Sequence, residues 1–255
     1  MSLWPCIAVV KLSVNVNKIA TIRNSRGGRI PSVLAAVETC VRAGAHGITV
    51  HPRADARHIT SADVRDIAGF LTGGGHRVEY NIEGDPRPEL LELVHSVTPD
   101  QCTLVPVQPG EITSQAGWSA TTPSAVLAKV VRDLRDARVR VSLFVDAHDA
   151  PIRWAADLGA DRVELYTEPF ARAFEYGGAE ARRSFAAYVE AAELAHSLGL
   201  GVNAGHDLDL DNLVMFRTLP HLDEVSIGHA LISRAVFEGL QESVRGFLAV
   251  LIEKS

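Results

Sequence analysis

The stretch VRVSLFVDAHDAPIRWAADLGADRVELY, residues 139–166, shows the alternation that decides the fold. Residues Val139–Val145 are rich in apolar and β-branched side chains, which predicts a buried strand. Residues Asp149–Leu158 have the periodicity of an amphipathic helix, and Gly159 marks a left-handed stop before a second strand at Arg162–Tyr166. The stretch therefore predicts a strand, a helix and a second strand in succession.

The same alternation continues from one end of the chain to the other. Most of the expected strands are nearly continuous apolar runs, suited to burial on both faces of a parallel sheet, and they lie at Ile7–Val16, Gly47–His51, Arg77–Ile82, Gln101–Val105, Val139–Val145, Arg162–Tyr166, Gly201–Asn203 and Glu224–Ile227. The expected helices lie at Pro31–Ala43, Ser61–Leu71, Pro88–Val97, Pro123–Ala137, Asp149–Leu158, Glu180–Leu198, Asp209–Leu219 and Ile232–Glu253. Eight such units predict an α/β fold, a (β/α)8 TIM barrel in a single domain over residues 1–255, with a doubly wound open sheet as the alternative.

The composition of the chain narrows its function classes. The 255 residues are 47% hydrophobic, and 25 Lys plus Arg against 31 Asp plus Glu give a net charge of −6. This balance argues against a general role on nucleic acid or an anionic membrane, and no apolar run approaches the roughly 18 residues of a membrane span. Cys6, Cys40 and Cys102 have no CxxC spacing and no signal peptide precedes them, so we expect free thiols in a cytoplasmic protein.

The connections that follow the strands are longer than those that return from helix to strand. Three of them are long: Asn17–Ile30, Val107–Thr122 and Thr167–Ala179. Long loops of this kind are typical of active-site lids. We therefore expect the functional face at the carboxyl ends of the strands, as in other barrels of this class.

The residues that close the expected strands are unusually polar, and they include Asn15, His51, Glu83, Asp146, Glu164, Asn203, His206 and His229. Taken singly, each has an ordinary explanation as a helix cap or a structural histidine. Taken together, carboxylates and histidines at one barrel mouth suit proton transfer in both directions. Metal binding stays an alternative because all the His, Glu and Asp residues of this set are ligand types, although no HxH or HExxH spacing appears.

Two features predict binding of phosphate groups. Gly228-His229-Ala230 leads from the last strand into a helix, where free backbone N–H groups and the helix dipole favour an anion. Cationic residues also gather after the first two strands, namely Lys18, Arg23, Arg26, Arg29, Arg53, Arg57 and His58. We expect Arg26 and Arg53 to clamp an anion, and Arg29 and Arg57 to be solvated surface charges.

Several ordered motifs resemble the pyridoxine 5′-phosphate synthase family of vitamin B6 biosynthesis: VNVNKIATIRNSRG at 14–27, GITVHPR at 47–53, RHI at 57–59, VNAGH at 202–206 and GHALI at 228–232. The resemblance spans nearly the whole chain. It implies a (β/α)8 barrel with extra helices used in contacts of a homo-oligomer, commonly an octamer, and no metal or organic cofactor. The implied reaction condenses 1-deoxy-D-xylulose 5-phosphate with 3-amino-2-oxopropyl phosphate through an imine, and it yields pyridoxine 5′-phosphate, phosphate and water.

The resemblance also implies residue roles. The catalytic set comprises two general bases, a general acid and a group that stabilises charge during dehydration: His51 and Glu83, His206, and Glu164. The amino ketone phosphate would be held by Asn15, Gly228 and His229, and the deoxyxylulose phosphate by Arg26, Arg53, His58 and Thr113. Glu83 is preferred to Glu79 because Asn81-Ile82-Glu83 keeps the order of the family motif.

The chain departs from the commonest family pattern at positions that bear on substrate binding. Asn17 and Lys18 stand where the family usually has Asp and His, Asp207 follows His206 in place of Gly, and Thr167 is followed by Glu168 in place of Gly. Val107-Gln108-Pro109 likewise replaces a charged stretch. We expect Lys18 to contact a phosphate or ketone oxygen, and Asp207 to bring negative charge close to an anionic substrate.

Two other functions remain open at this point. A metal-dependent sugar-phosphate aldolase or isomerase would use His51, Glu83, His206 and Glu164 as ligands. A non-catalytic barrel that binds one phosphorylated metabolite would account for the substitutions at Asn17, Lys18 and Asp207. We rank this binding protein lowest because the four acid–base residues are all present.

Overall fold

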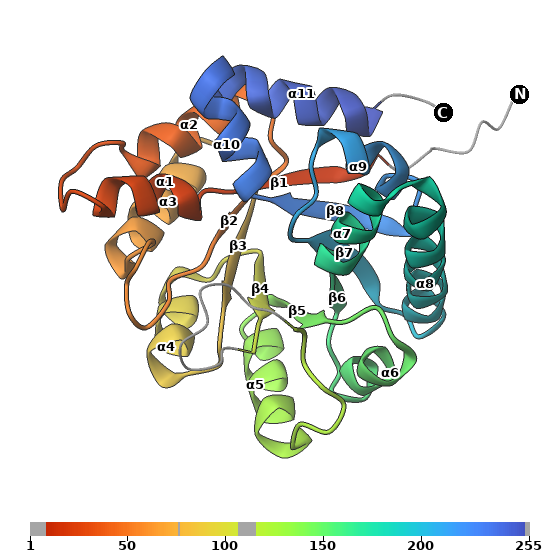
Figure 1. Ribbon diagram of the computed structural model, residues 1–255. Helices are drawn as coiled ribbons and strands as arrows, with labels where there is room; N and C mark the ends of the chain where they lie inside the picture. The colour runs from red at the N-terminus through yellow and green to blue at the C-terminus, as the bar shows by residue number, and fades with distance from the viewer. Residues whose placement is uncertain (1–8, 76, 107–115, 253–255) are drawn as a thin grey trace, which may run out of the picture.

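A computed structural model describes residues 9–75, 77–106 and 116–252 of the chain. Eight parallel strands form a closed barrel in chain order (Figure 1), which confirms the TIM barrel and excludes the open sheet. The strands are β1 (Lys11–Asn15), β2 (Gly47–Val50), β3 (Glu79–Gly84), β4 (Gln101–Leu104), β5 (Arg140–Val145), β6 (Arg162–Tyr166), β7 (Gly201–Gly205) and β8 (Leu222–Ile227). Pairing of β1 with β8 closes the ring, with Ser13 opposite Ser226.

The helices surround the barrel, as Figure 1 shows. They are α1 (Asn17–Asn24), α2 (Val33–Ala43), α3 (Ser61–Gly73), α4 (Pro88–Val97), α5 (Ser124–Asp136), α6 (Asp149–Asp157), α7 (Glu168–Tyr176), α8 (Gly178–Ser197), α9 (Leu210–Phe216), α10 (His229–Glu238) and α11 (Leu240–Ile252). Two of the expected long loops are thus wrong in part, because α1 and α7 occupy them. The expected last helix is two helices, since Gly239 has a φ of 86° and breaks the chain between them. No helix of the described ranges is long and apolar enough to cross a membrane.

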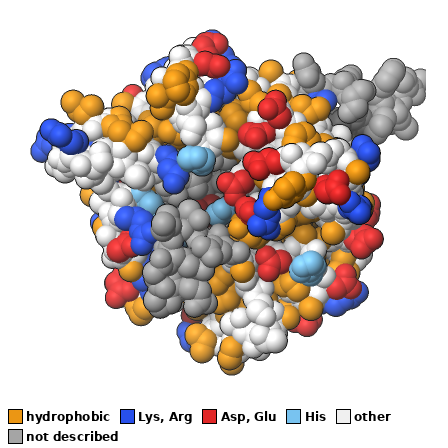
Figure 2. Space-filling model, in the orientation of Figure 1, with side chains coloured by type: hydrophobic (Ala, Val, Ile, Leu, Met, Phe, Trp, Pro, Cys, Tyr) orange, Lys and Arg blue, Asp and Glu red, His pale blue; other side chains and the backbone are white. Residues whose placement is uncertain are grey.

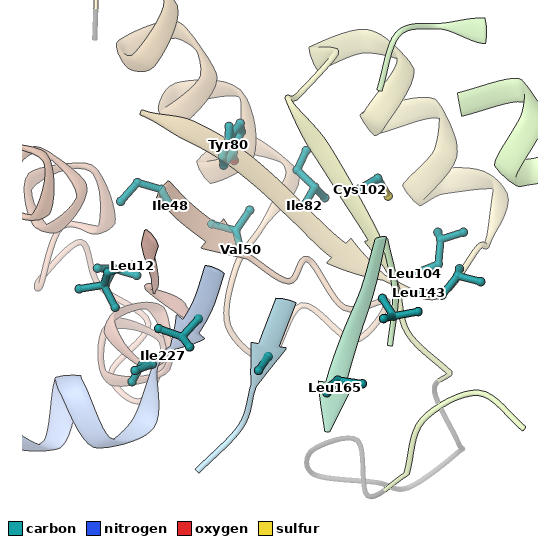
Figure 3. Close-up of a cluster of buried hydrophobic side chains, with 14 of the residues drawn as sticks. Leu12, Ile48, Val50, Tyr80, Ile82, Cys102, Leu104, Leu143, Leu165 and Ile227 are labelled. Atoms are coloured by element: carbon teal, nitrogen blue, oxygen red, sulfur yellow. The ribbon is translucent and has the colours of Figure 1, made fainter. Parts of the chain in front are cut away.

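Along each strand, apolar and polar side chains alternate. The expectation of nearly continuous apolar strands, buried on both faces, is therefore wrong for the inward face. Their outward side chains are apolar and pack beneath the helices, and Figure 3 shows Leu12, Ile48, Val50, Tyr80, Ile82, Cys102, Leu104, Leu143, Leu165 and Ile227 among them. Their inward side chains are polar yet also buried, and they include Ser13, Thr49, Asn81, Thr103, Ser142, Glu164, Asn203 and Glu224. The barrel interior is therefore polar, unlike the branched apolar layers common in this fold.

Hydrogen bonds join several of the inward side chains, although the Ser142 hydroxyl has no partner among the described residues. Ser13 Oγ lies 2.7 Å from Thr49 Oγ1, and Asn81 Nδ2 donates to Thr49 Oγ1 at 3.3 Å. Thr103 Oγ1 in turn donates to Asn81 Oδ1 at 3.1 Å. Asn203 Nδ2 lies 3.5 Å from Gln101 Oε1, although β7 and β4 are not neighbours, so this contact spans the barrel. Paired in this way, the polar groups escape most of the cost of burial.

Helix α1 anchors the segment that follows β2. Arg23 forms an ion pair with Asp63, which also completes the capping box of α3 with Thr60. Asn24 Nδ2 donates to the carbonyl oxygen of His58 at 2.8 Å. Arg23 is therefore a structural cation, and it helps to place His58 at the barrel mouth. The thiols of Cys40 and Cys102 are buried and free, as expected, whereas Cys6 lies outside the described residues.

Candidate active site

A cavity of about 410 Å³ opens at the carboxyl ends of the strands. Its lining contains the expected catalytic residues and most expected binding residues: Asn15, Asn17, Lys18, His51, Arg53, His58, Glu83, Glu164, His206, Asp207, Gly228 and His229. Arg26 is exposed beyond α1 and does not line this cavity, and Thr113 lies outside the described residues. Histidines surround the middle of this face in Figure 2, with Lys or Arg toward α1 and Asp or Glu toward α7.

His51 follows β2 and faces the carboxylate of Glu83. Its backbone N–H donates to Asn17 Oδ1 at 2.9 Å, so the Asn17 amide oxygen holds the start of this segment. Its Nδ1 lies 3.9 Å from Glu83 Oε2, and its Nε2 has no hydrogen-bond partner among the described residues. Burial, followed by the charges of His58 and Arg53, holds the pKa of His51 well below its usual value. The ring is therefore neutral at pH 7 and ready to accept a proton.

Glu83 and Glu164 are both buried on the inward face, at 8% and 2% exposure. Asn15 Nδ2 is 3.4 Å from Glu83 Oε2. Burial raises the pKa of Glu83 well above its usual value, and the nearby charges of Glu164 and Glu224 add to the effect. Burial and Glu224 also raise the pKa of Glu164 to about 8. These carboxyl groups are thus largely protonated at neutral pH.

Glu164 fits closely against β7. A Cβ atom added at Gly205 would lie 2.5 Å from Glu164 Oε1, so glycine is required for the carboxyl group to occupy this position. Glu79, by contrast, forms ion pairs with Lys11 and Arg140. These three residues lie at the amino ends of β3, β1 and β5, away from the cavity. This placement keeps Glu79 out of the cavity and leaves Glu83 in it.

His206 lies at the end of β7 in the left-handed region, with a φ of 79°. Thr167 secures this turn, since its backbone N–H donates to the Gly205 carbonyl oxygen at 3.1 Å and its hydroxyl contacts the carbonyl oxygens of Gly205 and His206. The imidazole packs against Phe144 and Tyr166, with ring centroids 5.1 and 5.4 Å away. Burial lowers the pKa of His206, Asp207 opposes this shift and Lys18 adds to it.

One of the expected anion sites is at the amino end of α10. Gly228 precedes the helix, and a Cβ atom there would lie 3.1 Å from Asn15 Cβ. Glycine therefore allows β1 and the start of α10 to approach closely. Asn15, Gly228 and His229 line one side of the cavity together, where the first N–H groups of α10 can bind an anion.

Cations line the cavity after β1 and β2, on the part of the rim next to β8 and α10. Arg53 is 9% exposed, and burial together with the charge of Arg53 lowers the pKa of His58 to about 4. The charge of Lys18, on α1, contributes to the lowered pKa of both His58 and His206. Arg57, expected as a surface charge, is exposed and pairs with Asp55, but it also borders the cavity. One cavity thus holds a helix amino end, several cations and the acid–base groups.

Sequence reasoning missed several groups around this cavity. Phe144 lines it and Tyr166 packs against His206, although neither was selected from the sequence. Both occupy inward positions near strand ends, and recognising the period-two alternation would have identified them. Glu224 was also missed, because it was counted only as the start of an apolar strand.

The donor geometry bears on the metal-dependent alternative. Within residues 9–75, 77–106 and 116–252, no three His, Cys, Asp or Glu side chains are grouped so that they could hold a metal ion. His51, Glu83, Glu164 and His206 therefore lie around one cavity without forming a ligand set in this structure.

The fold and the cavity define a TIM barrel with cationic and acid–base groups at the carboxyl ends of its strands. Its fold is shared with tryptophan synthase from M. tuberculosis, at a TM-score of 0.65 and 12% identity, covering 97% of this chain and 94% of that chain. It is also shared with phosphoribosyl anthranilate isomerase from Thermotoga maritima, at a TM-score of 0.61 and 14% identity, covering 95% and 98%.

Sequence comparison identifies the family. The family described as "Pyridoxal phosphate biosynthesis protein PdxJ" matches residues 12–253, and the chain belongs to it. A pyridoxine 5′-phosphate synthase from Porphyromonas gingivalis is 49% identical over 94% of this chain and 98% of its own length. Synthases of the same name from Leptospira biflexa and Cytophaga hutchinsonii are 48% and 49% identical, each over 95% of this chain and 97% and 99% of their own lengths. The resemblance noted in the motifs is thus confirmed.

Proposed function

We propose that this protein is a pyridoxine 5′-phosphate synthase, which condenses 1-deoxy-D-xylulose 5-phosphate with 3-amino-2-oxopropyl phosphate. The observation that carries the proposal is the cavity that gathers the amino end of α10, the cations after β1 and β2, and the acid–base groups, because a condensation of two phosphorylated substrates needs anion sites close to proton-transfer groups. Family membership and the names of the close relatives support the same activity.

The substrates would bind with their phosphates at two places on the rim near β8, β1 and β2, and with their reacting carbons toward the acid–base groups of the cavity. The start of α10, with Asn15, Gly228 and His229, takes the amino ketone phosphate. Arg53 and His58 take the deoxyxylulose phosphate. Lys18 lines the cavity, where it can bind a phosphate or ketone oxygen. Its positive charge offsets the negative charge of Asp207.

The protonation states of the cavity residues suit the first proton transfers. His51 is neutral and can take a proton from the amine or from a carbon next to the imine. Glu83 and Glu164 carry protons and can donate hydrogen bonds to oxygens that gain negative charge. Glu83 becomes a general base only after it gives up its proton, which the arrival of a cationic iminium would promote.

His206 would act as the general acid in the dehydrating steps. Burial lowers the pKa of His206, so its imidazole must gain a proton before it can give one. Two phosphorylated substrates supply negative charge beside it, and that charge raises the pKa of an imidazole. We therefore expect His206 to become protonated in the substrate complex and to protonate the departing hydroxyl group.

The deciding experiment incubates purified, chelator-treated protein with both substrates and follows pyridoxine 5′-phosphate by mass spectrometry. Formation of the product, with no requirement for added metal, is the expected result. If folded protein yields no product with both substrates present, the proposed function is wrong. Activity that is lost on chelation and restored by a divalent metal would favour the metal-dependent aldolase or isomerase.

We also propose that the protein works in the cytoplasm as a homo-oligomer, with an octamer expected. Exposed apolar side chains favour a covered surface: Ile30, Val236 and Phe237 are 85%, 68% and 90% exposed. Light scattering on a size-exclusion column tests the oligomer, and a monomer at micromolar concentration would contradict it. The expectation of a single domain over residues 1–255 stays a prediction.

A further inference from the structure

Glu224 is a buried carboxyl group that the proposed reaction does not use. It belongs to β8, is 3% exposed and lies outside the lining of the cavity. Burial of an ionisable carboxyl group costs free energy, so the groups around Glu224 decide whether it carries a charge. The polar barrel interior connects it to the cavity.

The strand register places Glu224 close to Glu164. Asn203 is paired with Glu164 across β6 and β7, and with Glu224 across β7 and β8. Two strand spacings separate the two glutamates, or about 10 Å between their Cα atoms. Asn203 Nδ2 lies 3.4 Å from Glu224 Oε1, while Asn203 Oδ1 accepts a hydrogen bond from Arg162 at 2.7 Å. Asn203 therefore turns its donor group toward Glu224.

Charges on four other strands act on Glu224. They are Lys11 on β1, Glu79 on β3, Arg140 on β5 and Arg162 on β6. The charge of Glu224 in turn raises the pKa of Glu83 on β3 and of Glu164 on β6. Lys11 and Arg140 form ion pairs with Glu79, so much of their charge is already compensated. Burial and Glu79 raise the pKa of Glu224 to about 7, against the opposing effect of the three cations.

We propose that Glu224 is a positioning residue that acts through Glu164: the two buried carboxyl groups share one proton, and the negative charge of Glu224 keeps that proton on Glu164. Glu164 then meets the substrates as a neutral acid. In this form it donates a hydrogen bond to an oxygen on which negative charge develops, instead of repelling the phosphates. The proposal rests on the proposed function only for this catalytic consequence.

The pair also predicts a direction of pH dependence. Removing the charge of Glu224 lets Glu164 ionise more easily, so the midpoint of Glu164 ionisation moves to lower pH. For two charges about 10 Å apart in a protein interior, the interaction corresponds to about one pH unit. A purely structural role for Glu224 would not move this midpoint.

Infrared difference spectroscopy of the protonated carboxyl band, recorded as a function of pH, measures this midpoint without substrates. The band of Glu164 is assigned by its loss in Glu164→Gln. We expect Glu224→Gln to lower the Glu164 midpoint by about one pH unit, and Glu224→Asp to restore most of it. Glu193→Gln, which removes a surface carboxylate on α8, is the matched control and should leave the midpoint unchanged.

An unchanged Glu164 midpoint in folded Glu224→Gln overturns the proposal. If this variant does not fold, the reciprocal measurement decides. Because Glu224 ionises while Glu164 is still neutral, Glu164→Gln should leave the midpoint of Glu224 unchanged. A Glu224 midpoint that falls by about one pH unit in that variant would place the charge on Glu164 and the proton on Glu224, and it overturns the proposal.

Turnover provides the second readout. In active wild-type protein, the alkaline decline in kcat should move to lower pH by the same interval in Glu224→Gln. If the alkaline decline in kcat stays at the same pH while the infrared midpoint of Glu164 moves, the proposed catalytic role of neutral Glu164 is overturned. A wild-type protein without synthase activity would overturn the proposed function, while the infrared result would still decide whether the two carboxyl groups are coupled.

Discussion

Glu79 and Glu83 lie on the same face of the same strand and have opposite electrostatic fates. Burial alone would raise the pKa of Glu79, but hydrogen bonds from Lys11 and Arg140 lower it. Glu83 lies one strand length away beside His51 and Glu164, and its pKa is raised. In the half of the barrel interior at the amino ends of the strands, Glu79 is paired with cations. In the half at the carboxyl ends, carboxyl groups lie beside neutral histidines. The paired charges stabilise the barrel, and the carboxyl groups at the carboxyl ends are available to substrates.

The largest expected effect separates these two halves directly. Glu83→Gln should lower kcat by about two to four orders of magnitude, the usual contribution of an acid–base group, with the fold retained. Steady-state kinetics with both substrates measures it, and circular dichroism checks the fold. Turnover within a few-fold of wild type would remove Glu83 from the proton transfers and would break the comparison.

The same contrast applies to the histidines. His206→Asn should also lower kcat by about two to four orders of magnitude, with little change in the free energy of unfolding. His196 is the matched control, because it stacks on His221 at the surface with ring centroids 3.7 Å apart. His196→Asn should keep wild-type turnover. A His206→Asn enzyme that binds both substrates and turns over normally would leave His51 and Glu83 as the remaining candidates.

A smaller effect is expected at the phosphate side of the cavity. Gly228→Ala places a methyl group 3.1 Å from Asn15 Cβ, so the first turn of α10 must shift. We expect kcat/KM for 3-amino-2-oxopropyl phosphate to fall by about tenfold. The KM for the deoxyxylulose phosphate should stay near its wild-type value. An equal rise in the KM values of the two substrates would contradict the assignment of separate phosphate sites.

Glu79→Gln should show the reverse pattern, with turnover within a few-fold of wild type and a loss of stability. Leaving Lys11 and Arg140 without their carboxylate should cost about 1–3 kcal/mol at pH 7, measured by urea unfolding. Because the folded pKa of Glu79 is lowered, its stabilisation is present above the unfolded pKa and is lost as pH falls through the folded value. The difference from wild type should therefore shrink at acidic pH, and a constant difference would contradict the ion-pair account.

The fold was largely predictable from the sequence because each strand and helix has its own start and stop signals. Pro88 and the residues after it defined α4 with the bounds that the structure has. Helices α1 and α7 were taken for loops, since α1 carries Lys18 and Arg23 among few apolar residues and its packing depends on tertiary contacts such as Arg23 with Asp63. The helix propensity of a short segment does not reflect such tertiary contacts.

The site was predictable where chemistry gathers at strand ends and less so inside the barrel. His51, Glu83 and His206 were selected because a barrel brings the ends of its strands together. Phe144 and Glu224 were missed because their strands were interpreted as continuous apolar runs. Only the closed barrel decides which alternate residues face inward, and only the register shows that Glu224 lies one strand beyond Asn203.

The most direct test compares wild-type, Glu83→Gln and Glu79→Gln proteins in one ³¹P NMR time course with both substrates. Wild type and Glu79→Gln should release one inorganic phosphate for each pyridoxine 5′-phosphate formed, and neither substrate alone should release any. Glu83→Gln should be slower by at least about a hundredfold. Absence of product with folded wild-type protein, or equal losses in the two variants, would contradict the account.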